Sequence, residues 1–443
     1  MNILLKYLYE KMSEFPNSLI SDENEKITYG ELIEFAETHH TIFLNRKYGI
    51  VCKGVINTIK AIFCCLFSDV TAVIMSDKYG KSYCQKIINK TKISYLVDDS
   101  GIKCIAPEIE EKEDISDVAY IMCTSGTTGE PKAAMITYNN ILCNIKDIGK
   151  YFNINSSDTI LITRPLCHAS ALVGELFVSL MCGANIVVNG LDYNPFLIYR
   201  TLCKEKITVF CATPTVCYQL ADICSRKEDR INIRKIAISG ECMTRIVAHK
   251  LLNTFQDSEL FNVYGLTEAS PRVSYLSPDL FNKKPESVGA ALDSVKLKIV
   301  DGELYVSGDS VMKGYYEDPE LTKKTIQEGW LKTGDMASFD SEGLLYIKGR
   351  KDNLIIRAGI NIYPQEIENV LLQDEHIKNV IAYRIKNDIA GDRIGLKVET
   401  NNLTEEEIFN ICKKLLPTYQ LPDVIKCVDK LPQSTNGKLI RCS

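Results

Sequence analysis

The chain has 443 residues, of which 45% are hydrophobic and 25% are charged, and its formal net charge at pH 7 is −5. This composition predicts an ordinary globular protein that is long enough for more than one domain. An acidic chain has no overall positive field, so nucleic acid and an anionic membrane surface are not expected partners.

The cysteines and the apolar stretches exclude further classes of protein. The 17 cysteines are scattered, with no C-x-x-C pair and no Cys/His cluster, so neither a disulfide framework nor a structural zinc site is predicted. We expect most of them, such as Cys64 and Cys211, to be small core side chains in a reducing cytosol. The N-terminal segment lacks the pattern of a signal peptide, and the longest apolar stretch, residues 55–75, contains Lys60 and Asp69. A cytoplasmic protein without a membrane span is therefore expected.

The first chemical signal along the chain is a run of hydroxyl residues and glycines. It reads Thr124-Ser-Gly-Thr-Thr-Gly-Glu-Pro-Lys132 and follows an apolar strand expected at residues 120–123. Gly126 and Gly129 allow a tight turn whose backbone amides can point at phosphate oxygens. The hydroxyl groups and Lys132 add donors and positive charge. Because the spacing of a Walker A loop is absent, we predict a phosphate loop of another kind, and a kinase or P-loop ATPase is disfavoured.

Strand-like and helix-like segments then alternate. Four short apolar runs near turn residues are predicted to be buried strands, at residues 161–163, 186–188, 209–212 and 235–239. Helical patterns lie between them, for example at residues 171–182 and 195–204. Alternation of this kind favours an α/β fold, with parallel sheets covered by helices.

The pattern changes from residue 296 onward. Residues 297–300 and 302–306 are expected to form an antiparallel hairpin, and residues 343–348 a further strand, because the strands are short and Asp/Gly turns separate them. A charged link, Gly349-Arg-Lys-Asp-Asn353, follows them.

Beyond the link, a helix is expected at residues 364–373, then two strands, then a helix at residues 405–416. We therefore predict a large N-terminal domain of helix-covered sheets, residues 1–349, and a small α+β C-terminal domain, residues 350–443.

Five segments, in this order, resemble the motifs of the adenylate-forming superfamily, which includes acyl-CoA synthetases, luciferases and peptide-synthetase adenylation domains. They are Thr124 to Lys132, Tyr264-Gly-Leu-Thr-Glu268, Leu331-Lys-Thr-Gly-Asp335, Gly349-Arg-Lys-Asp352 with its continuation to Glu368, and Leu431-Pro-Gln-Ser-Thr-Asn-Gly-Lys438. The resemblance covers roughly residues 20 to 443 and is closest to AMP-forming acyl-CoA synthetases. It implies an acid–thiol ligase that uses ATP and Mg²⁺ to make an acyl-adenylate from a small carboxylic acid.

The resemblance also implies the nucleotide-binding residues. The phosphates would be held by Thr124, Ser125, Gly126, Thr127, Thr128, Gly129 and Lys132. Adenine and ribose would be bound by Gly240, Glu241, Tyr264, Asp335 and Arg350. The catalytic residues would be Thr267 at the α-phosphate, Glu268 as the Mg²⁺ ligand, and Lys438 between the attacking carboxylate and the α-phosphate.

The pocket for the acid would be lined by His168, Ala169, Val173 and Gly265. Relatives that activate amino acids place an Asp soon after the pocket His, and this chain has Ala169-Ser-Ala-Leu-Val173 there. Because an unpaired substrate ammonium group is costly to bury, we expect a fatty, aryl or other acid without an α-amino group. Glu175 is within reach of the pocket, but mostly apolar helix surrounds it.

The thiol is expected to come from a separate molecule, because the chain ends two residues after Arg441 without a carrier domain. Coenzyme A is favoured slightly, and the resemblance places the thiol step near Gly359 after a rotation about a hinge at residues 350–353, with Asp352 as the hinge position. One alternative is a stand-alone ligase that loads the phosphopantetheine of a separate acyl carrier protein. The other is an inactive nucleotide-binding regulatory protein.

The chain departs from the usual motifs at three positions. Ala133, Tyr138 and Lys332 stand where a Gly, a His and an aromatic residue are common in the family. These departures bear on the acid and the acceptor more than on the adenylation chemistry.

Overall fold

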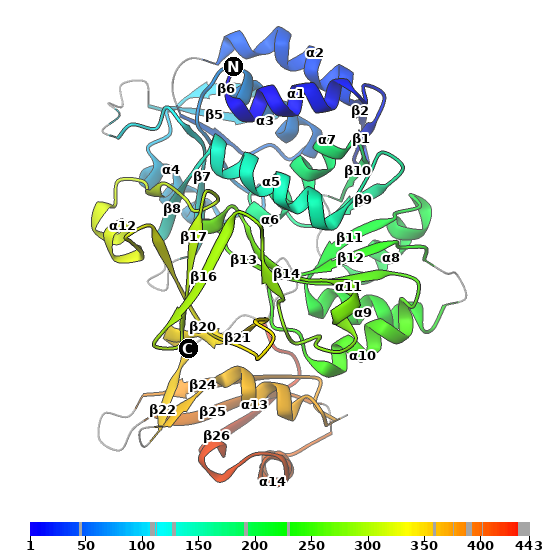
Figure 1. The fold of residues 1–443 in the computed structure, drawn as a ribbon, viewed down its shortest axis with the longest axis vertical. Helices are drawn as coiled ribbons and strands as arrows, with labels where there is room; N and C mark the ends of the chain where they lie inside the picture. Colours follow the sequence, from blue (N-terminus) through cyan, green and yellow to red (C-terminus); the bar gives the residue numbers. More distant parts are fainter. Residues whose placement is uncertain are drawn as a thin grey trace.

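The structure is a computed structural model that describes residues 1–43, 47–106, 111, 113–125, 130–189, 194–227, 231–357, 360–374, 376–386, 392–400 and 402–432. Within these ranges the strands form sheets of nine, seven, five, three and two strands. Figure 1 shows the N-terminal helices and the three larger sheets in the upper part of the molecule and a small C-terminal unit at the bottom. In the same ranges, no helix combines the length and the apolar character needed to cross a membrane.

The nine-stranded sheet contains the four predicted parallel strands. Its order is β15-β14-β13-β12-β11-β9-β10-β1-β2. The bounds are β1 Leu19–Ser21, β2 Lys26–Thr28, β9 Thr159–Ile162, β10 Asn185–Val188, β11 Val209–Ala212, β12 Lys235–Ile238, β13 Glu259–Gly265, β14 Arg272–Leu276 and β15 Ala290–Ala291. Strands β9 to β13 and β1 run parallel, and the antiparallel pairings lie at the two ends of the sheet.

Alternate side chains of these strands enter two separate cores, since successive residues of a strand point to opposite faces. Leu161, Phe210 and Ile236 pack with the helices α8 (Pro195–Lys204), α9 (Pro214–Cys224) and α10 (Arg245–Thr254). Ile160 and Cys211 enter the main core with α1 (Ile3–Ser13), α5 (Tyr138–Phe152) and α7 (Val178–Cys182). Both faces of the sheet are covered, which confirms the predicted helix-covered parallel sheet.

The seven-stranded sheet has the order β18-β8-β7-β4-β3-β5-β6. The bounds are β3 Tyr48–Ile50, β4 Ala72–Ile74, β5 Tyr95–Asp98, β6 Gly101–Cys104, β7 Val118–Ser125, β8 Pro131–Thr137 and β18 Gly314–Tyr315. Its neighbouring helices are α2 (Tyr29–His39), the 3₁₀ turn η1 (His40–Ile42), α3 (Val55–Phe67) and α4 (Lys81–Thr91). Strands β3, β4, β5 and β7 run parallel, and β8 returns antiparallel to β7.

The helix predicted at residues 171–182 is longer and less regular than expected. It begins as α6 (Ala169–Ala171), continues as a π-helix, η2 (Leu172–Phe177), and ends as α7 at Gly183, whose φ of +71° stops the helix in a left-handed conformation. Amphipathic spacing alone does not distinguish an α-helix from one that contains a π-helical turn. Such turns occur frequently at functional sites.

The third sheet is antiparallel and contains the predicted hairpin. Its strands are β16 (Val295–Val300), β17 (Glu303–Gly308), β19 (Ile326–Gln327), β20 (Trp330–Phe339) and β21 (Leu345–Arg350). The hairpin pairs β16 with β17, and β17 and β21 both pair with β20. The short helices α11 (Pro278–Phe281) and α12 (Pro319–Thr325) and the 3₁₀ turn η3 (Thr267–Ala269) complete the large domain.

The C-terminal unit has an apolar core of its own, which extends from Ile355 to Leu416. Its elements are η4 (Lys351–Asn353), β22 (Ile355–Arg357), β23 (Ile360–Ile362), α13 (Pro364–Leu371), β24 (Asn379–Ile385), β25 (Arg393–Glu399), α14 (Glu405–Leu415), η5 (Thr418–Gln420) and β26 (Val424–Val428). A large N-terminal α/β domain followed by a small α+β domain confirms the predicted fold class. The exact boundary at residue 349 stays a prediction.

Candidate active site

The predicted site segments follow the carboxyl ends of neighbouring parallel strands. Residues 239–241 follow β12, and residues 264–268 begin at the end of β13, the strand that pairs with β12. Gly240 has a φ of +94°, a left-handed conformation that favours glycine. Gly265 is exposed, and a Cβ atom there would lie 1.9 Å from the Pro271 carbonyl oxygen, so only glycine fits. Both turns keep their backbone accessible at the edge where open α/β sheets bind ligands.

Three residues predicted to bind adenine and ribose form one hydrogen-bonded set. The Tyr264 hydroxyl donates to Asp335 Oδ2 at 2.5 Å, and the Arg350 guanidinium donates to Asp335 Oδ1 at 3.1 Å. Asp335 and Arg350 are register partners in β20 and β21. Arg350 also donates to the Thr333 carbonyl at 2.9 Å. The structure thus brings together residues that lie up to 86 positions apart in the sequence, from 264 to 350.

The charge state of this set is fixed by its surroundings. Burial, and then the Asp335 carboxylate, raise the pKa of Tyr264 far above its usual value, so its hydroxyl remains a donor. Asp335 is buried and lies beside the Arg350 cation. Each carboxylate oxygen has two lone pairs, so Asp335 keeps acceptor capacity for additional donors such as vicinal hydroxyl groups.

Glu268 lies in η3, directly after β13, and contacts the seven-stranded sheet. Tyr315 of β18 donates its hydroxyl to Glu268 Oε1 at 2.9 Å, and the Met312 amide donates to the Glu268 carbonyl at 2.9 Å. Strand β18 pairs with β8, and Cα atoms of β8 and η3 approach within 8 Å. Glu268 Oε2 makes no hydrogen bond to the described residues, so the carboxylate fits the role of a ligand for a hard divalent cation. Thr267 lies beside it and is half-buried.

The described ends of the predicted phosphate segment lie on two paired antiparallel strands, β7 and β8. Thr124 at the end of β7 and Lys132 near the start of β8 are register partners, and both are half-buried. Ser125 ends β7. Residues 126–129, which include Gly126, Thr127, Thr128 and Gly129, lie outside the described residues. Lys132 was predicted as the end of a loop, and the structure places it in a strand because residues 131–137 pair with β7.

The predicted acid-pocket residues surround the start of the irregular helix. The His168 carbonyl accepts hydrogen bonds from the amides of Ala171 and Leu172 at 3.0 Å, which positions His168 as the residue before α6. Burial, and to a lesser extent the Arg164 cation, lowers the pKa of His168 to about 4, so the imidazole is neutral at pH 7. Ala169 and Val173 are buried behind it.

Sequence reasoning did not single out two charged residues next to this pocket. Arg164 donates to Glu175 Oε1 at 2.5 Å and to Ser239 Oγ at 3.3 Å. Arg272 of β14 is the register partner of Gly265 and is 3% exposed. One signal was available: Arg272 opens a strand of otherwise uncharged residues, which is an unusual place for a cation.

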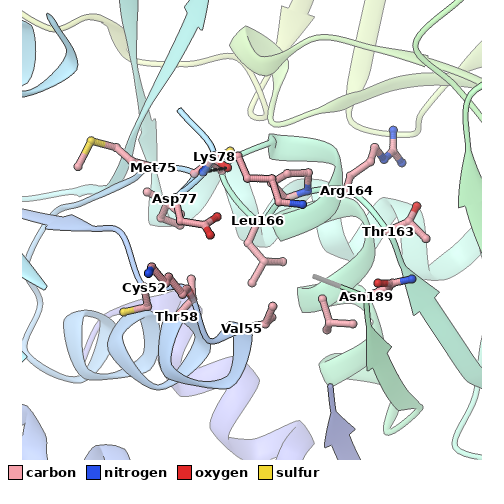
Figure 2. Close-up of a pocket in the computed structure, with 16 residues that line it drawn as sticks. Cys52, Val55, Thr58, Met75, Asp77, Lys78, Thr163, Arg164, Leu166 and Asn189 are labelled. Carbon is pink, nitrogen blue, oxygen red and sulfur yellow. Dashed lines mark hydrogen bonds between the residues drawn. The ribbon is translucent and has the colours of Figure 1, made fainter. Parts of the chain in front are cut away.

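A cavity that is partly open to solvent lies between the carboxyl ends of the two large sheets. Figure 2 shows Cys52 and Asp77, which follow β3 and β4, on one side, and Arg164 and Asn189, which follow β9 and β10, on the other. None of the predicted ATP-binding residues that the structure describes lines this cavity, whereas the segment that precedes His168 does.

The link to the small domain begins inside this network. Lys351 forms an ion pair with Glu303 of β17 at 2.7 Å, next to the pair between Arg350 and Asp335. Asp352, the predicted hinge position, is exposed in η4. Lys438 and Gly359 lie outside the described residues.

We expect His168 to make folding sensitive to acid. Its pKa is about 4 in the folded protein against an ordinary 6.5, so between these values the unfolded chain binds more protons and acidification favours unfolding. A fully developed effect of this size corresponds to at most about 3 kcal/mol. In urea unfolding measured from pH 7 to pH 4, His168→Asn should lose less stability than the wild type. A variant whose loss equals that of the wild type would contradict the neutral, buried imidazole.

Two family descriptions match the chain. Residues 98–316 match "AMP-binding enzyme", and residues 366–438 match "AMP-binding enzyme C-terminal domain". Together the two matches span more than half of the chain.

Individual relatives are CoA ligases. The chain is 31% identical over 346 residues to a long-chain-fatty-acid–CoA ligase of Escherichia coli O6:H1, and the match covers 73% of this chain and 61% of that ligase. The chain thus spans about three fifths of the length of that relative. A 2-succinylbenzoate–CoA ligase of Bacillus cereus is 26% identical over 466 residues, with 95% of this chain and 94% of that ligase covered.

Solved structures agree with these matches. An o-succinylbenzoate CoA synthetase from Bacillus subtilis, in complex with its acyl-adenylate intermediate, superposes with a TM-score of 0.85 at 26% identity. The alignment covers 98% of this chain and 96% of that one. A complex of the same synthetase with ATP and magnesium ion gives a TM-score of 0.85 at 25% identity and 98% coverage of both chains. The chain therefore belongs to the AMP-binding enzyme family, in the adenylate-forming superfamily and close to its acyl-CoA synthetases.

Proposed function

We propose that the protein is an AMP-forming ligase that activates a carboxylic acid with ATP and transfers the acyl group to the thiol of coenzyme A. The observation that carries the proposal is the set of Tyr264, Asp335 and Arg350, joined by hydrogen bonds at the edge where Glu268 and the β7–β8 hairpin also lie. A site built in this way offers hydroxyl, carboxylate and cationic groups to one nucleotide. The names of the relatives, all CoA ligases, support the same reaction.

The proposed nucleotide contacts follow from the geometry of the residues. Asp335 would accept from the ribose hydroxyls, while Arg350 and Tyr264 hold that carboxylate in position by hydrogen bonds. Gly240 and Glu241 would flank the adenine. Glu241 is held in position by hydrogen bonds from Thr215, at 2.7 Å from the hydroxyl and 3.3 Å from the amide.

The proposed chemistry is the meeting of two negatively charged groups, so charge neutralisation and positioning would carry most of the catalysis. Mg²⁺, when bound, would neutralise phosphate oxygens. Glu268 would hold the cation through Oε2, Lys132 would contact the outer phosphates, and Thr267 would donate to the α-phosphate. We place Lys438 between the substrate carboxylate and the α-phosphate, where its ammonium group reduces their repulsion.

We propose an acid that lacks an α-amino group. Ala169 offers no carboxylate for an ammonium group, and the neighbouring Glu175 already accepts from Arg164. His168 is neutral at pH 7 and is better suited to line the pocket than to bind an anion by charge. The relatives named for long-chain fatty acids and for 2-succinylbenzoate also act on acids without an α-amino group.

The function is tested by pyrophosphate release with purified protein, ATP, Mg²⁺ and a panel of carboxylic acids, with and without coenzyme A. We expect at least one acid to release pyrophosphate and to give a CoA thioester, whereas common α-amino acids should be poor substrates because an unpaired buried charge costs several kcal/mol. Discharge of the adenylate only by a pantetheinylated carrier protein would reassign the acceptor. Absence of both pyrophosphate release and ATP binding would contradict the proposal.

Tyr264 and Asp335 should control nucleotide affinity to different extents. Tyr264→Phe removes one hydrogen bond to a charged group, which typically contributes about 1.5–3 kcal/mol, so the Kd for ATP should rise roughly 10-fold to 100-fold. Asp335→Ala should weaken binding more, because it also leaves Arg350 without its partner. Tyr346→Phe is the matched control. The Tyr346 hydroxyl donates to a different carboxylate, Asp340 Oδ2, at 3.5 Å, and this pair lies outside the proposed site. Calorimetric titration with ATP measures all three, and equal effects of Tyr264→Phe and Tyr346→Phe would exclude the proposed role.

Lys438 and Asp352 should separate the two half-reactions. Removing one group that neutralises transition-state charge typically costs about 3–4 kcal/mol. Lys438→Ala should therefore slow adenylate formation by roughly 10²–10³-fold. It should leave thioester formation from a synthetic acyl-adenylate near normal. Asp352→Pro should do the reverse, because it restricts the link that must rotate between the two steps. If Lys438→Ala slows both half-reactions equally, the two-orientation mechanism is wrong for this protein.

A further inference from the structure

Three charged side chains are buried together behind the proposed acid pocket. Arg164 is 10% exposed and Glu175 is fully buried in the π-helical turn η2. Arg272 of β14 is 3% exposed. Fully buried charges are rare unless they are paired, so each of the three needs a partner.

The partners present within the protein do not complete the cluster. Arg164 pairs with Glu175, but among the described residues no carboxylate lies within 4 Å of the Arg272 guanidinium. In that part of the chain, Arg272 Nε and Nη1 have no hydrogen-bond partner, and neither do Arg164 Nε and Glu175 Oε2. Four polar atoms of one small region are therefore left without hydrogen bonds.

The cluster also carries an excess of positive charge. The cluster contains two guanidinium groups and one carboxylate. Burial raises the pKa of Glu175, which favours the protonated, uncharged form of that carboxylate and increases the excess of positive charge. The Cys211 thiol and the Tyr151 hydroxyl near Arg272 do not supply the missing charge, because burial raises the pKa of each to about 12. A water molecule would satisfy hydrogen bonds here but would not balance the charge.

The cluster borders the residues assigned to the acid. Arg272 is the register partner of Gly265, and a Cβ atom on Gly174 would lie 3.3 Å from Arg272 Nε, so η2 and β14 meet at this guanidinium. Arg164 lies four positions before His168 in the sequence and lines the cavity drawn in Figure 2. The guanidinium of Arg164 points away from Asp77 in that view.

We propose that Arg164 and Arg272 form a second anion-binding subsite in the acid pocket, and that the preferred substrate carries a second carboxylate in addition to the one that is activated. This inference rests on the proposed ligase function and names its substrate class. A second carboxylate would accept from the open N–H groups of Arg272 and Arg164 and would neutralise the cluster. A purely hydrocarbon tail would leave those groups desolvated and unpaired, which a site built for hydrogen bonding rejects strongly.

The test compares diacids with monoacids of the same length in pyrophosphate release. Succinate, adipate, suberate and terephthalate are measured beside butyrate, hexanoate, octanoate and p-toluate. We expect the best diacid to exceed its monoacid in kcat/KM by at least about 10-fold. Arg272→Met should lower kcat/KM for that diacid by about 100-fold or more, with the monoacid unchanged or improved. Arg272→Lys, which keeps the charge but not the planar fork, should lie between the two.

The control is Arg234→Met. Arg234 pairs with the buried Asp158 at the amino edge of the same sheet, so this variant removes an arginine that is paired with a buried carboxylate without touching the pocket. It should leave the preference for diacids intact. Thermal unfolding and the Kd for ATP establish that each variant is folded.

Two results would overturn the subsite. One is a wild-type preference for monoacids, which leaves the ligase function standing. The other is an equal loss of diacid and monoacid turnover in Arg272→Met, which would make the cluster a structural one. If no acid of the panel turns over, calorimetric titration of the diacids in the presence of ATP decides, and binding that does not depend on Arg272 rejects the proposal.

Discussion

Parallel pairing of strands is the constraint on which the site depends. Strands β9 to β13 run in one direction in the nine-stranded sheet, and β3, β4 and β7 do so in the seven-stranded sheet. Every turn that follows such a strand emerges at the same edge of its sheet, so segments distant in the sequence become neighbours. Arg164, the turn at residues 239–241 and the turn at residues 264–268 lie together for this reason. The cavity between the two sheets is bounded by residues that follow β3, β4, β9 and β10.

The third sheet connects this edge to the small domain through charge. Asp335 and Arg350 pair across β20 and β21, and Lys351 pairs with Glu303 of β17. The first residues of the link are therefore held by carboxylates of the large domain, one of which also contacts Tyr264. A ligand that competes for Asp335 would act on the attachment of the link as well. In the proposed mechanism, such an arrangement would couple occupancy of the nucleotide site to the orientation of the C-terminal domain, as the two half-reactions require.

Buried charge has different roles in two parts of the protein. In the set of Tyr264, Asp335 and Arg350, each charged group has a partner, and the set is preorganised. In the cluster of Arg164, Glu175 and Arg272, several polar atoms have none. Buried polar atoms without hydrogen-bond partners lower the stability of the folded protein. A ligand that supplies those hydrogen bonds in a neighbouring pocket therefore gains binding free energy from them. The proposed nucleotide set thus has its hydrogen bonds before a ligand binds. In the proposed anion subsite, by contrast, the positive charge is balanced only when the second carboxylate of the substrate binds.

The sequence by itself determined the fold class and the order of the motifs, and it supplied the residues of the proposed site, whose roles stay predictions. Short apolar runs between helical patterns predict parallel strands because burial of both sheet faces demands such runs, and β9 to β12 lie where this reasoning places them. Gly240 and Gly265 can also be recognised in the sequence, since each lies in a turn at the end of a strand, where the backbone must stay accessible.

Only the tertiary structure decided which of these residues touch. The contact of Tyr264 with Asp335 depends on how a parallel sheet and an antiparallel sheet pack, and local spacing carries no such information. The π-helical turn at residues 172–177 could not be predicted, because periodicity does not distinguish helix types. The position of Arg272 at the start of an otherwise uncharged strand was a signal in the sequence, but its burial had to come from the structure, because a lone arginine in a strand is usually at the surface. The paired charges of Arg164 and Glu175 follow from the same cause: long-range packing, not local sequence, fixes which buried charges meet and which are left for a ligand.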